Sequence, residues 1–184
     1  MGDVWSEEKA AQWINENAKN IRCVIFSGGE PTIHILSILK TLNKVKKNIP
    51  IAINSNAYYS ESAAKILKDI IDIYIMDFRY FDDNCAQHLS QTPNYAEAAK
   101  RNLKLAEKNG ELVIRLLVMP GHLECDAKPI LYWIKNNLKK YRLNILSDYS
   151  PVYNAFKFME IGKKLSITEY GEITDFARKI GIET

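Results

Sequence analysis

The chain has 184 residues and a net charge of +3, and hydrophobic residues make up 47% of it, as expected for one globular domain over residues 1–184. This mild charge gives no reason to expect nucleic acid or a membrane surface as a partner. No signal peptide or bilayer-spanning apolar run is visible, and three widely spaced cysteines form no disulfide framework, so we expect a cytoplasmic protein.

Strand and helix patterns alternate along the chain. In chain order they predict a helix capped by Ser6 and ending near 19, a strand over 22–26, a helix over 35–45, a strand over 51–54, a helix over 63–70 and a strand over 72–76. After a long loop over 82–93, with one helical turn around Ala86, they predict a helix over 96–108, a strand over 111–119, a helix over 130–138, a strand over 142–146, an irregular segment over 150–166 and a helix over 170–180.

This alternation predicts an α/β fold with five parallel strands covered by helices. The sheet is either open and doubly wound or part of a βα barrel, with right-handed crossovers in both cases. In both architectures, ligands bind at the carboxyl ends of the strands.

Polar residues follow each predicted strand at that end. The candidates there are Gly28, Gly29 and Glu30 after the first strand, Asn54 and Asn56 after the second, Asp77 and Arg79 after the third, and Asp148 after the fifth. The glycines let backbone groups approach a ligand closely, because no Cβ intervenes. Glu30 is either a solvated turn residue or a carboxylate that binds an ammonium group.

Arg115 interrupts an apolar strand, where a guanidinium is costly unless it meets an anion. It either pairs internally with Glu30 or Asp77, or binds the carboxylate of a ligand. Among the histidines, His122 follows Pro-Gly at a strand end and is the better site candidate. Cys23 starts a strand, and Cys85 and Cys125 lie in predicted loops. None has the spacing of a zinc or iron–sulfur site, so we expect no metal ligands.

The ordered set of strand-end motifs resembles the radical S-adenosylmethionine (SAM) superfamily, and within it the pyruvate formate-lyase activating enzyme group. Ser27-Gly28-Gly29-Glu30-Pro31 is similar to the Gly-Gly-Glu motif of these enzymes. The other matching segments are Asn54-Ser55-Asn56, 72–80, 114–125 and Asp148-Tyr149-Ser150-Pro151. The resemblance covers nearly the whole chain and implies a partial six-unit TIM-like barrel that lacks its first strand.

The resemblance also implies residue roles. Gly28, Gly29 and Glu30 would bind the SAM amino group, and Asn54 and Asn56 would line the SAM pocket. Asp77 and Arg79 would stand where activating enzymes have an Asp-Leu-Lys segment that contacts SAM, with arginine replacing the lysine. Arg115 would lie near the methionyl and ribose groups, and Asp148 near a position that often carries histidine.

One family feature is missing from the sequence. Radical SAM enzymes bind a 4Fe–4S cluster through Cys-x-x-x-Cys-x-x-Cys after the first strand, and Cys23, Cys85 and Cys125 cannot replace it. We therefore expect no catalytic or metal-binding residue in the chain as given, and we interpret the chain as truncated at its N-terminus. The strand over 22–26 would then be an exposed sheet edge.

Three functions remain open. The first is the core of an enzyme whose complete form cleaves SAM to a 5′-deoxyadenosyl radical, which abstracts hydrogen from a glycyl-radical enzyme or another substrate, with an electron donor as a further partner. The second is a cluster-free module that binds SAM, another nucleotide or a protein without catalysis. The third is a plain α/β domain whose strand-end polar residues form internal ion pairs.

Overall fold

Five parallel strands form a single sheet in the computed structural model, which describes residues 3–182. The strands are β1 (Val24–Phe26), β2 (Ile51–Ser55), β3 (Ile73–Asp77), β4 (Glu111–Leu117) and β5 (Arg142–Leu146). The α-helices are α1 (Glu7–Asn17), α2 (Ile35–Leu42), α3 (Glu61–Leu67), α4 (Asp83–Ser90), α5 (Tyr95–Asn109), α6 (Lys128–Asn137) and α7 (Ile167–Lys179). Two 3-10 turns, η1 (Pro31–His34) and η3 (Tyr153–Lys157), and a π-helical turn, η2 (Leu123–Ala127), complete the elements.

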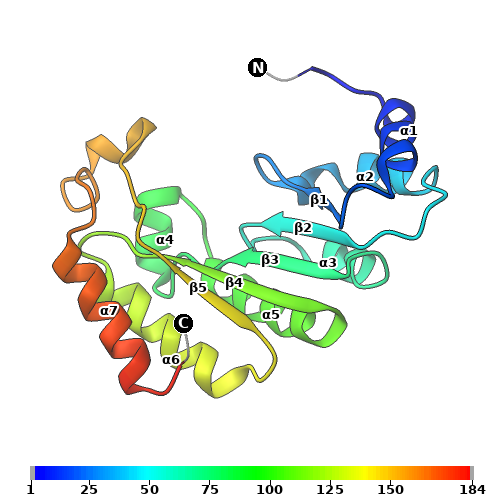
Figure 1. The fold of residues 1–184 in the computed structure, drawn as a ribbon. Coiled ribbons are helices and arrows are strands. Elements are labelled where there is room, and N and C mark those ends of the chain that lie inside the picture. The colour runs from blue at the N-terminus through cyan, green and yellow to red at the C-terminus, as the bar shows by residue number, and fades with distance from the viewer. Residues whose placement is uncertain (1–2, 183–184) are drawn as a thin grey trace.

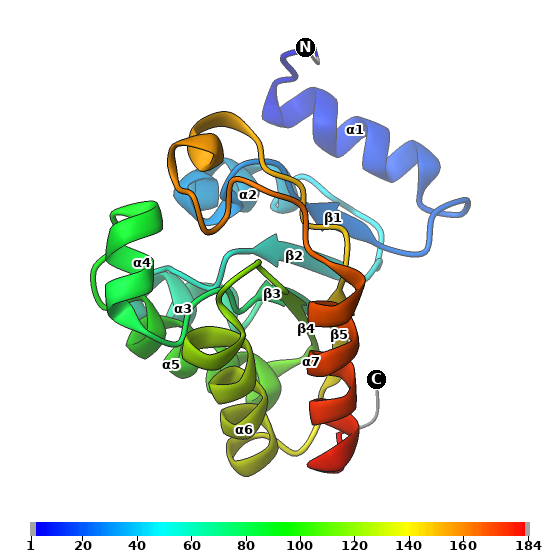
Figure 2. The same ribbon diagram turned by 90° about the vertical axis from the view of Figure 1, so that its left-hand side faces the viewer.

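The strand order distinguishes between the two predicted architectures. The order in the sheet is the order in the sequence, β1-β2-β3-β4-β5, with every neighbouring pair parallel. A doubly wound sheet reverses its order at a switch point, and this sheet has no reversal. Uniform right-handed crossovers then place the connecting helices on one side, as in a barrel wall. The expected partial barrel is confirmed, and Figures 1 and 2 show helices α3, α5, α6 and α7 along the outside of the curved sheet.

The two faces of the sheet differ in burial. Tyr74 and Met76 of β3, and Ile114 of β4, are at most 2% exposed and form the core beneath the helices. Ile75 and Val113, which point to the opposite face, are only half-buried. Burying a large apolar side chain contributes roughly 1.5–3 kcal/mol, so the helix-covered face supplies most of the folding energy. The inner face is only partly covered.

The first strand is a sheet edge, as expected. Strand β1 pairs with β2 alone, and its central residue, Ile25, is 49% exposed. Unpaired backbone groups along such an edge are available to a further strand.

The structure differs from the predicted elements in the segment between β3 and α5. Residues 82–93 contain helix α4 instead of a long loop with one turn. Asp82 caps this helix by accepting a hydrogen bond from Asn84 N at 2.7 Å, and Gln91 ends it in a left-handed conformation. Only Ala86 is fully buried in α4, so the helix has almost no apolar stripe for a sequence pattern to detect.

Smaller differences occur at element ends. Helix α1 ends at Asn17 instead of 19, and β3 extends to Asp77. Strand β4 ends at Leu117, two residues before the predicted end, because the chain turns at Pro120-Gly121 and enters η2. None of the helices in residues 3–182 combines the length and apolar composition needed to span a bilayer.

Candidate functional site

A continuous chain of hydrogen bonds links the carboxyl ends of four strands. Arg79 Nη2 donates to Asp77 Oδ2 at 2.7 Å, and Arg115 Nε donates to Asp77 Oδ1 at 2.7 Å. Arg115 Nη2 also donates to Asn54 Oδ1 at 2.9 Å, and Asn54 Nδ2 donates to Ser27 Oγ at 3.1 Å. We call these five residues the strand-end network. It brings together polar groups from β2, β3, β4 and the loop after β1.

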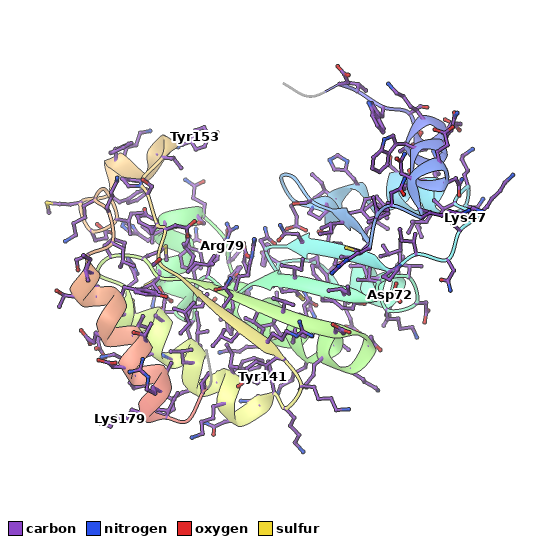
Figure 3. The ribbon with its side chains drawn as sticks, viewed as in Figure 1. Lys47, Asp72, Arg79, Tyr141, Tyr153 and Lys179 are labelled. Carbon is purple, nitrogen blue, oxygen red and sulfur yellow. The ribbon has the colours of Figure 1, made fainter. Side chains whose placement is uncertain are left out.

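The charges in this network do not balance. One carboxylate, Asp77, pairs with two guanidinium groups, those of Arg79 and Arg115. The Asp77 side chain is 12% exposed, whereas Arg115 is 31% and Arg79 47% exposed. Burial acts against the charge on Arg79, but the hydrogen bond and negative charge of Asp77 outweigh it and raise the pKa of that guanidinium. The network therefore carries a net positive charge toward solvent. Figure 3 shows Arg79 at the carboxyl end of β3 and Asp72 at the other end of the same strand.

Glu30 ties the loop after β1 to the end of β2. Its Oε1 atom accepts hydrogen bonds from Thr32 N at 3.1 Å, Thr32 Oγ1 at 2.7 Å and Ser55 Oγ at 2.9 Å. Its Oε2 atom accepts one, from Asn56 N at 2.8 Å. A carboxylate oxygen has about two lone pairs, so Oε2 keeps acceptor capacity for one further donor. Glu30 is thus a structural residue of this loop with one oxygen still available.

The two glycines before Glu30 present open backbone. A Cβ built on Gly28 or Gly29 would have no heavy atom within 4 Å, and both residues are exposed. Gly28 has a φ of +128°, which side-chain-bearing residues rarely adopt, whereas Gly29 has no positive φ. Only Gly28 is therefore required by the backbone conformation. For Gly29, neither a positive φ nor a neighbour among residues 3–182 requires glycine.

Tyr95, at the start of α5, holds two strand ends in place, and no sequence pattern identified it. Its hydroxyl lies 3.0 Å from Asn56 O and 3.1 Å from Asp77 O, and it accepts a hydrogen bond from Arg79 N at 3.0 Å. The side chain is 3% exposed. Asn102, about two turns after Tyr95 in α5, donates to Ala57 O at 2.8 Å and Tyr59 O at 2.9 Å. A tyrosine and an asparagine on an amphipathic helix look like ordinary helix residues, so only the fold reveals their role.

Besides Gly28, Gly29 and Glu30, two predicted site residues lie outside the network, Asn56 and Asp148. The side chain of Asn56 turns back, and its Oδ1 accepts a hydrogen bond from Tyr58 N at 2.8 Å. Asp148 lies exposed beyond the end of β5, and none of the hydrogen bonds found within residues 3–182 joins it to the other candidates. The structure thus brings together Asn54, Asp77, Arg79 and Arg115, with Glu30 beside them through Ser55 and Asn56.

Comparisons with known proteins give the family and the fold of the chain. The family model described as Radical SAM superfamily matches residues 2–134. The uncharacterized protein MJ0674 of Methanocaldococcus jannaschii is 36% identical over 179 residues, which cover 97% of this chain and 53% of the relative. The chain therefore spans about half the length of that relative. A crystal structure of a domain of pyruvate-formate lyase-activating enzyme from Bacteroides vulgatus superposes with a TM-score of 0.67 at 17% identity, covering 88% of this chain and 96% of that domain.

Proposed function

Because this chain belongs to the radical SAM superfamily, we propose that the strand-end network and the Gly28-Gly29 backbone form its SAM-binding site. The observation that carries the proposal is the pairing of one carboxylate with two guanidiniums beside an unobstructed glycine loop. SAM presents a carboxylate and an ammonium group on one end, and the site offers groups of opposite charge to both.

Each group of the site has a separate part in this proposal. Arg79 and Arg115 supply the positive charge that the SAM carboxylate requires, and charge-assisted hydrogen bonds of this kind are about twice as strong as neutral ones. Glu30 Oε2 and the open backbone at Gly28-Gly29 supply acceptors for the ammonium group. Asn54 links Arg115 to Ser27 and orients the guanidinium. Asn56 and Asp148 would act at the margin of the pocket.

For the complete protein we propose the reaction type of the pyruvate formate-lyase activating enzyme group. When bound, SAM and a reduced 4Fe–4S cluster supply reductive cleavage of SAM and hydrogen abstraction from a protein glycine or another substrate. The barrel-like sheet and the ordered strand-end motifs support this proposal. The residues of this chain would bind and orient SAM, and a glycyl-radical enzyme and an electron donor would be its partners.

The cluster does not fit the residues present here. Cys23 precedes β1, whereas Cys85 lies in α4 and Cys125 in η2, so the chain contains no triplet with the spacing of the family motif. We therefore derive no catalytic step through a cluster held by this chain.

The alternative function is a cluster-free module that binds SAM or a protein without catalysis. Anaerobic reconstitution with iron and sulfide separates the two functions. The alternative predicts no stoichiometric 4Fe–4S cluster on any natural form of the protein. A cluster on the full-length protein, together with SAM cleavage, would favour the enzyme.

A glycine substitution tests SAM binding directly. Gly29→Ala adds one methyl group where the chain itself has no neighbour, so it should change stability by no more than about 1 kcal/mol. If the ligand approaches this backbone, the methyl group clashes with it. Calorimetric titration should then show SAM affinity at least about tenfold lower than for the wild type.

The matched control is Gly171→Ala in α7, where a Cβ also meets nothing within 4 Å. It should raise stability by roughly 0.5–1 kcal/mol and leave SAM affinity unchanged. Unchanged SAM affinity in Gly29→Ala, or no SAM binding by the wild type at millimolar ligand, would overturn the proposal and leave the internal ion pairs as purely structural.

A further inference from the structure

Four potential metal ligands meet between the loops that follow β3 and β4. Cys85 lies in the first turn of α4, and His122, Cys125 and Asp126 lie in and just before η2. One ligand atom from each lies within 4.8 Å of all the others. We propose that these four residues, the two-loop cluster, form a zinc site that clamps the two loops together.

Four of the six distances in the two-loop cluster are close to the edges of a tetrahedron around a metal ion. The Sγ atoms of Cys85 and Cys125 are 3.4 Å apart, and Cys125 Sγ lies 3.3 Å from His122 Nδ1. Asp126 Oδ2 lies 3.2 Å from His122 Nδ1 and 3.7 Å from Cys125 Sγ. Zinc bonds of roughly 2.0–2.3 Å give tetrahedral edges of about 3.3–3.8 Å. These four distances are therefore near the size of a zinc coordination sphere, and the other two, from Cys85 to His122 and Asp126, are within 4.8 Å.

The backbone around the cluster orients its ligands. Asp126 N and Ala127 N both donate to His122 O at 3.1 Å, which closes a π-helical turn and brings His122, Cys125 and Asp126 to one side. Such turns occur frequently at functional sites. Asp126 Oδ1 accepts hydrogen bonds from Phe81 N at 2.6 Å and Asp82 N at 3.0 Å. These bonds fix the carboxylate and leave Oδ2 directed at the cluster.

His122 offers its Nδ1 atom to the cluster. Its side chain is 9% exposed, and Nδ1 faces Cys125 and Asp126. Coordination of a metal at Nδ1 would place the ring proton on Nε2, and no hydrogen-bond partner for Nε2 lies within residues 3–182. The support that His122 gives to the site is therefore the position of its Nδ1 atom.

The donor set selects the metal. Two thiolates and an imidazole are soft ligands that bind zinc, whereas calcium and magnesium prefer oxygen ligands alone. Four ligands from the protein form a closed, structural site without an open position. Both cysteines are half-buried. The clamp would hold the loop from Phe81 to Cys85, just beyond Asp77 and Arg79, against η2.

The test uses the tag-free 184-residue chain, without iron, after treatment with a chelator and a thiol reductant. Cobalt(II), a spectroscopic substitute for zinc, should bind in about one equivalent, with tetrahedral d–d bands and a thiolate-to-cobalt charge-transfer band. Zinc should displace it. X-ray absorption of the zinc-loaded wild type should show two sulfur and two nitrogen or oxygen neighbours, and this readout needs no variant to fold.

Matched serine variants identify the ligands. Cys85→Ser and Cys125→Ser should each weaken zinc binding by at least about 100-fold. Cys23→Ser should leave zinc affinity unchanged, because Cys23 precedes β1 and is not part of the cluster.

Three outcomes would overturn the proposal. The first is no tight zinc or cobalt binding, and the second is binding that survives Cys85→Ser or has a different sulfur count. The third is a Cys85–Cys125 disulfide as the stable state in reducing buffer, which requires the sulfur atoms to approach to about 2.05 Å. SAM binding plays no part in any of these measurements, so they fail or succeed independently of the proposed function.

Discussion

At the residue scale, the arginine within β4 forms the internal ion pair, which is one of the two environments that were open to it from the sequence. Arg115 forms an internal ion pair with Asp77 and not with Glu30, whose carboxylate accepts hydrogen bonds from Thr32, Ser55 and Asn56. Asp77 also pairs with Arg79, so the ion pair leaves one guanidinium charge uncompensated. An internal pair and a ligand site are therefore compatible here.

We predict that Arg115→Met affects binding more than folding. Asp77 keeps Arg79 as a partner, and Arg115 is 31% exposed, so the loss in stability should be about 1–2 kcal/mol, between the values for exposed and buried pairs. Loss of a charge-assisted hydrogen bond to SAM should lower affinity about tenfold or more. Chemical denaturation and calorimetry measure the two effects.

Arg142→Met is the matched control, because Arg142 is exposed at the opposite end of the sheet, 3.9 Å from Glu111. It should change neither quantity appreciably. A larger effect of Arg115→Met on stability than on SAM affinity would identify Arg115 as a structural ion-pair residue.

We also predict that Tyr95→Phe weakens the scaffold of the site. Removal of the hydroxyl leaves Asn56 O, Asp77 O and Arg79 N without that partner in a buried region, at a cost of about 1–3 kcal/mol. Urea denaturation measures the loss. Tyr132→Phe, at a tyrosine that is 50% exposed, serves as the control. If both substitutions change the free energy of unfolding by the same small amount, the Tyr95 hydroxyl does not contribute to stability and only the packing of its ring does.

At the element scale, strands were more predictable than the segments between them. Strand positions follow from β-branched apolar runs bounded by turn residues, and all five were located within two residues of their ends. Helix α4 was predicted only as one helical turn, because its residues are mostly polar, and the π-helical turn η2 was not predicted, because it depends on contacts with other elements. Asp126, for example, bonds to Phe81 and Asp82, far away in the sequence.

Helix α7 allows a prediction about pH. Ser166 and Glu169 form a capping box, and Glu169 Oε1 also accepts a hydrogen bond from Gly121 N at 3.0 Å. The hydrogen bond from Ser166 is the main cause that lowers the pKa of Glu169. Stabilisation by this carboxylate is present above the usual glutamate pKa of about 4.3 and disappears as the pH falls through the lowered value.

Ser166→Ala should therefore cost about 1 kcal/mol at neutral pH, and this difference from the wild type should shrink as the pH falls below about 4. Denaturation at several pH values measures it. Ser60→Ala, which removes the N-cap of α3, is the control. The third residue of α3 is Ala63, which has no side chain that can be protonated, so the cost of Ser60→Ala should not change with the protonation of a glutamate at that position. A pH-independent cost of Ser166→Ala would show that Glu169 contributes no charge-dependent stabilisation.

At the scale of the whole molecule, the sequence predicted which residues lie at one edge of the sheet but not which of them touch. Parallel strands bring Asn54, Asp77 and Arg115 to the same edge, because their carboxyl ends point the same way. The exclusion of Asp148 depends on the path of the chain after β5, which no pattern specifies. The meeting of Cys85 with Cys125 likewise depends on how two loops pack, since forty residues separate them in the sequence.

The most direct test of the account is a nuclear magnetic resonance titration of the isotope-labelled chain with SAM. If SAM binds at the carboxyl edge of the sheet, the backbone amide signals that shift should be those of Ser27 to Glu30, Asn54 to Asn56, and Asp77 to Arg79. Amides at the opposite edge, such as Glu111 and Arg142, should remain unchanged. Shifts scattered over the surface, or no shifts at millimolar SAM, would contradict the central claim that these strand ends form one SAM site.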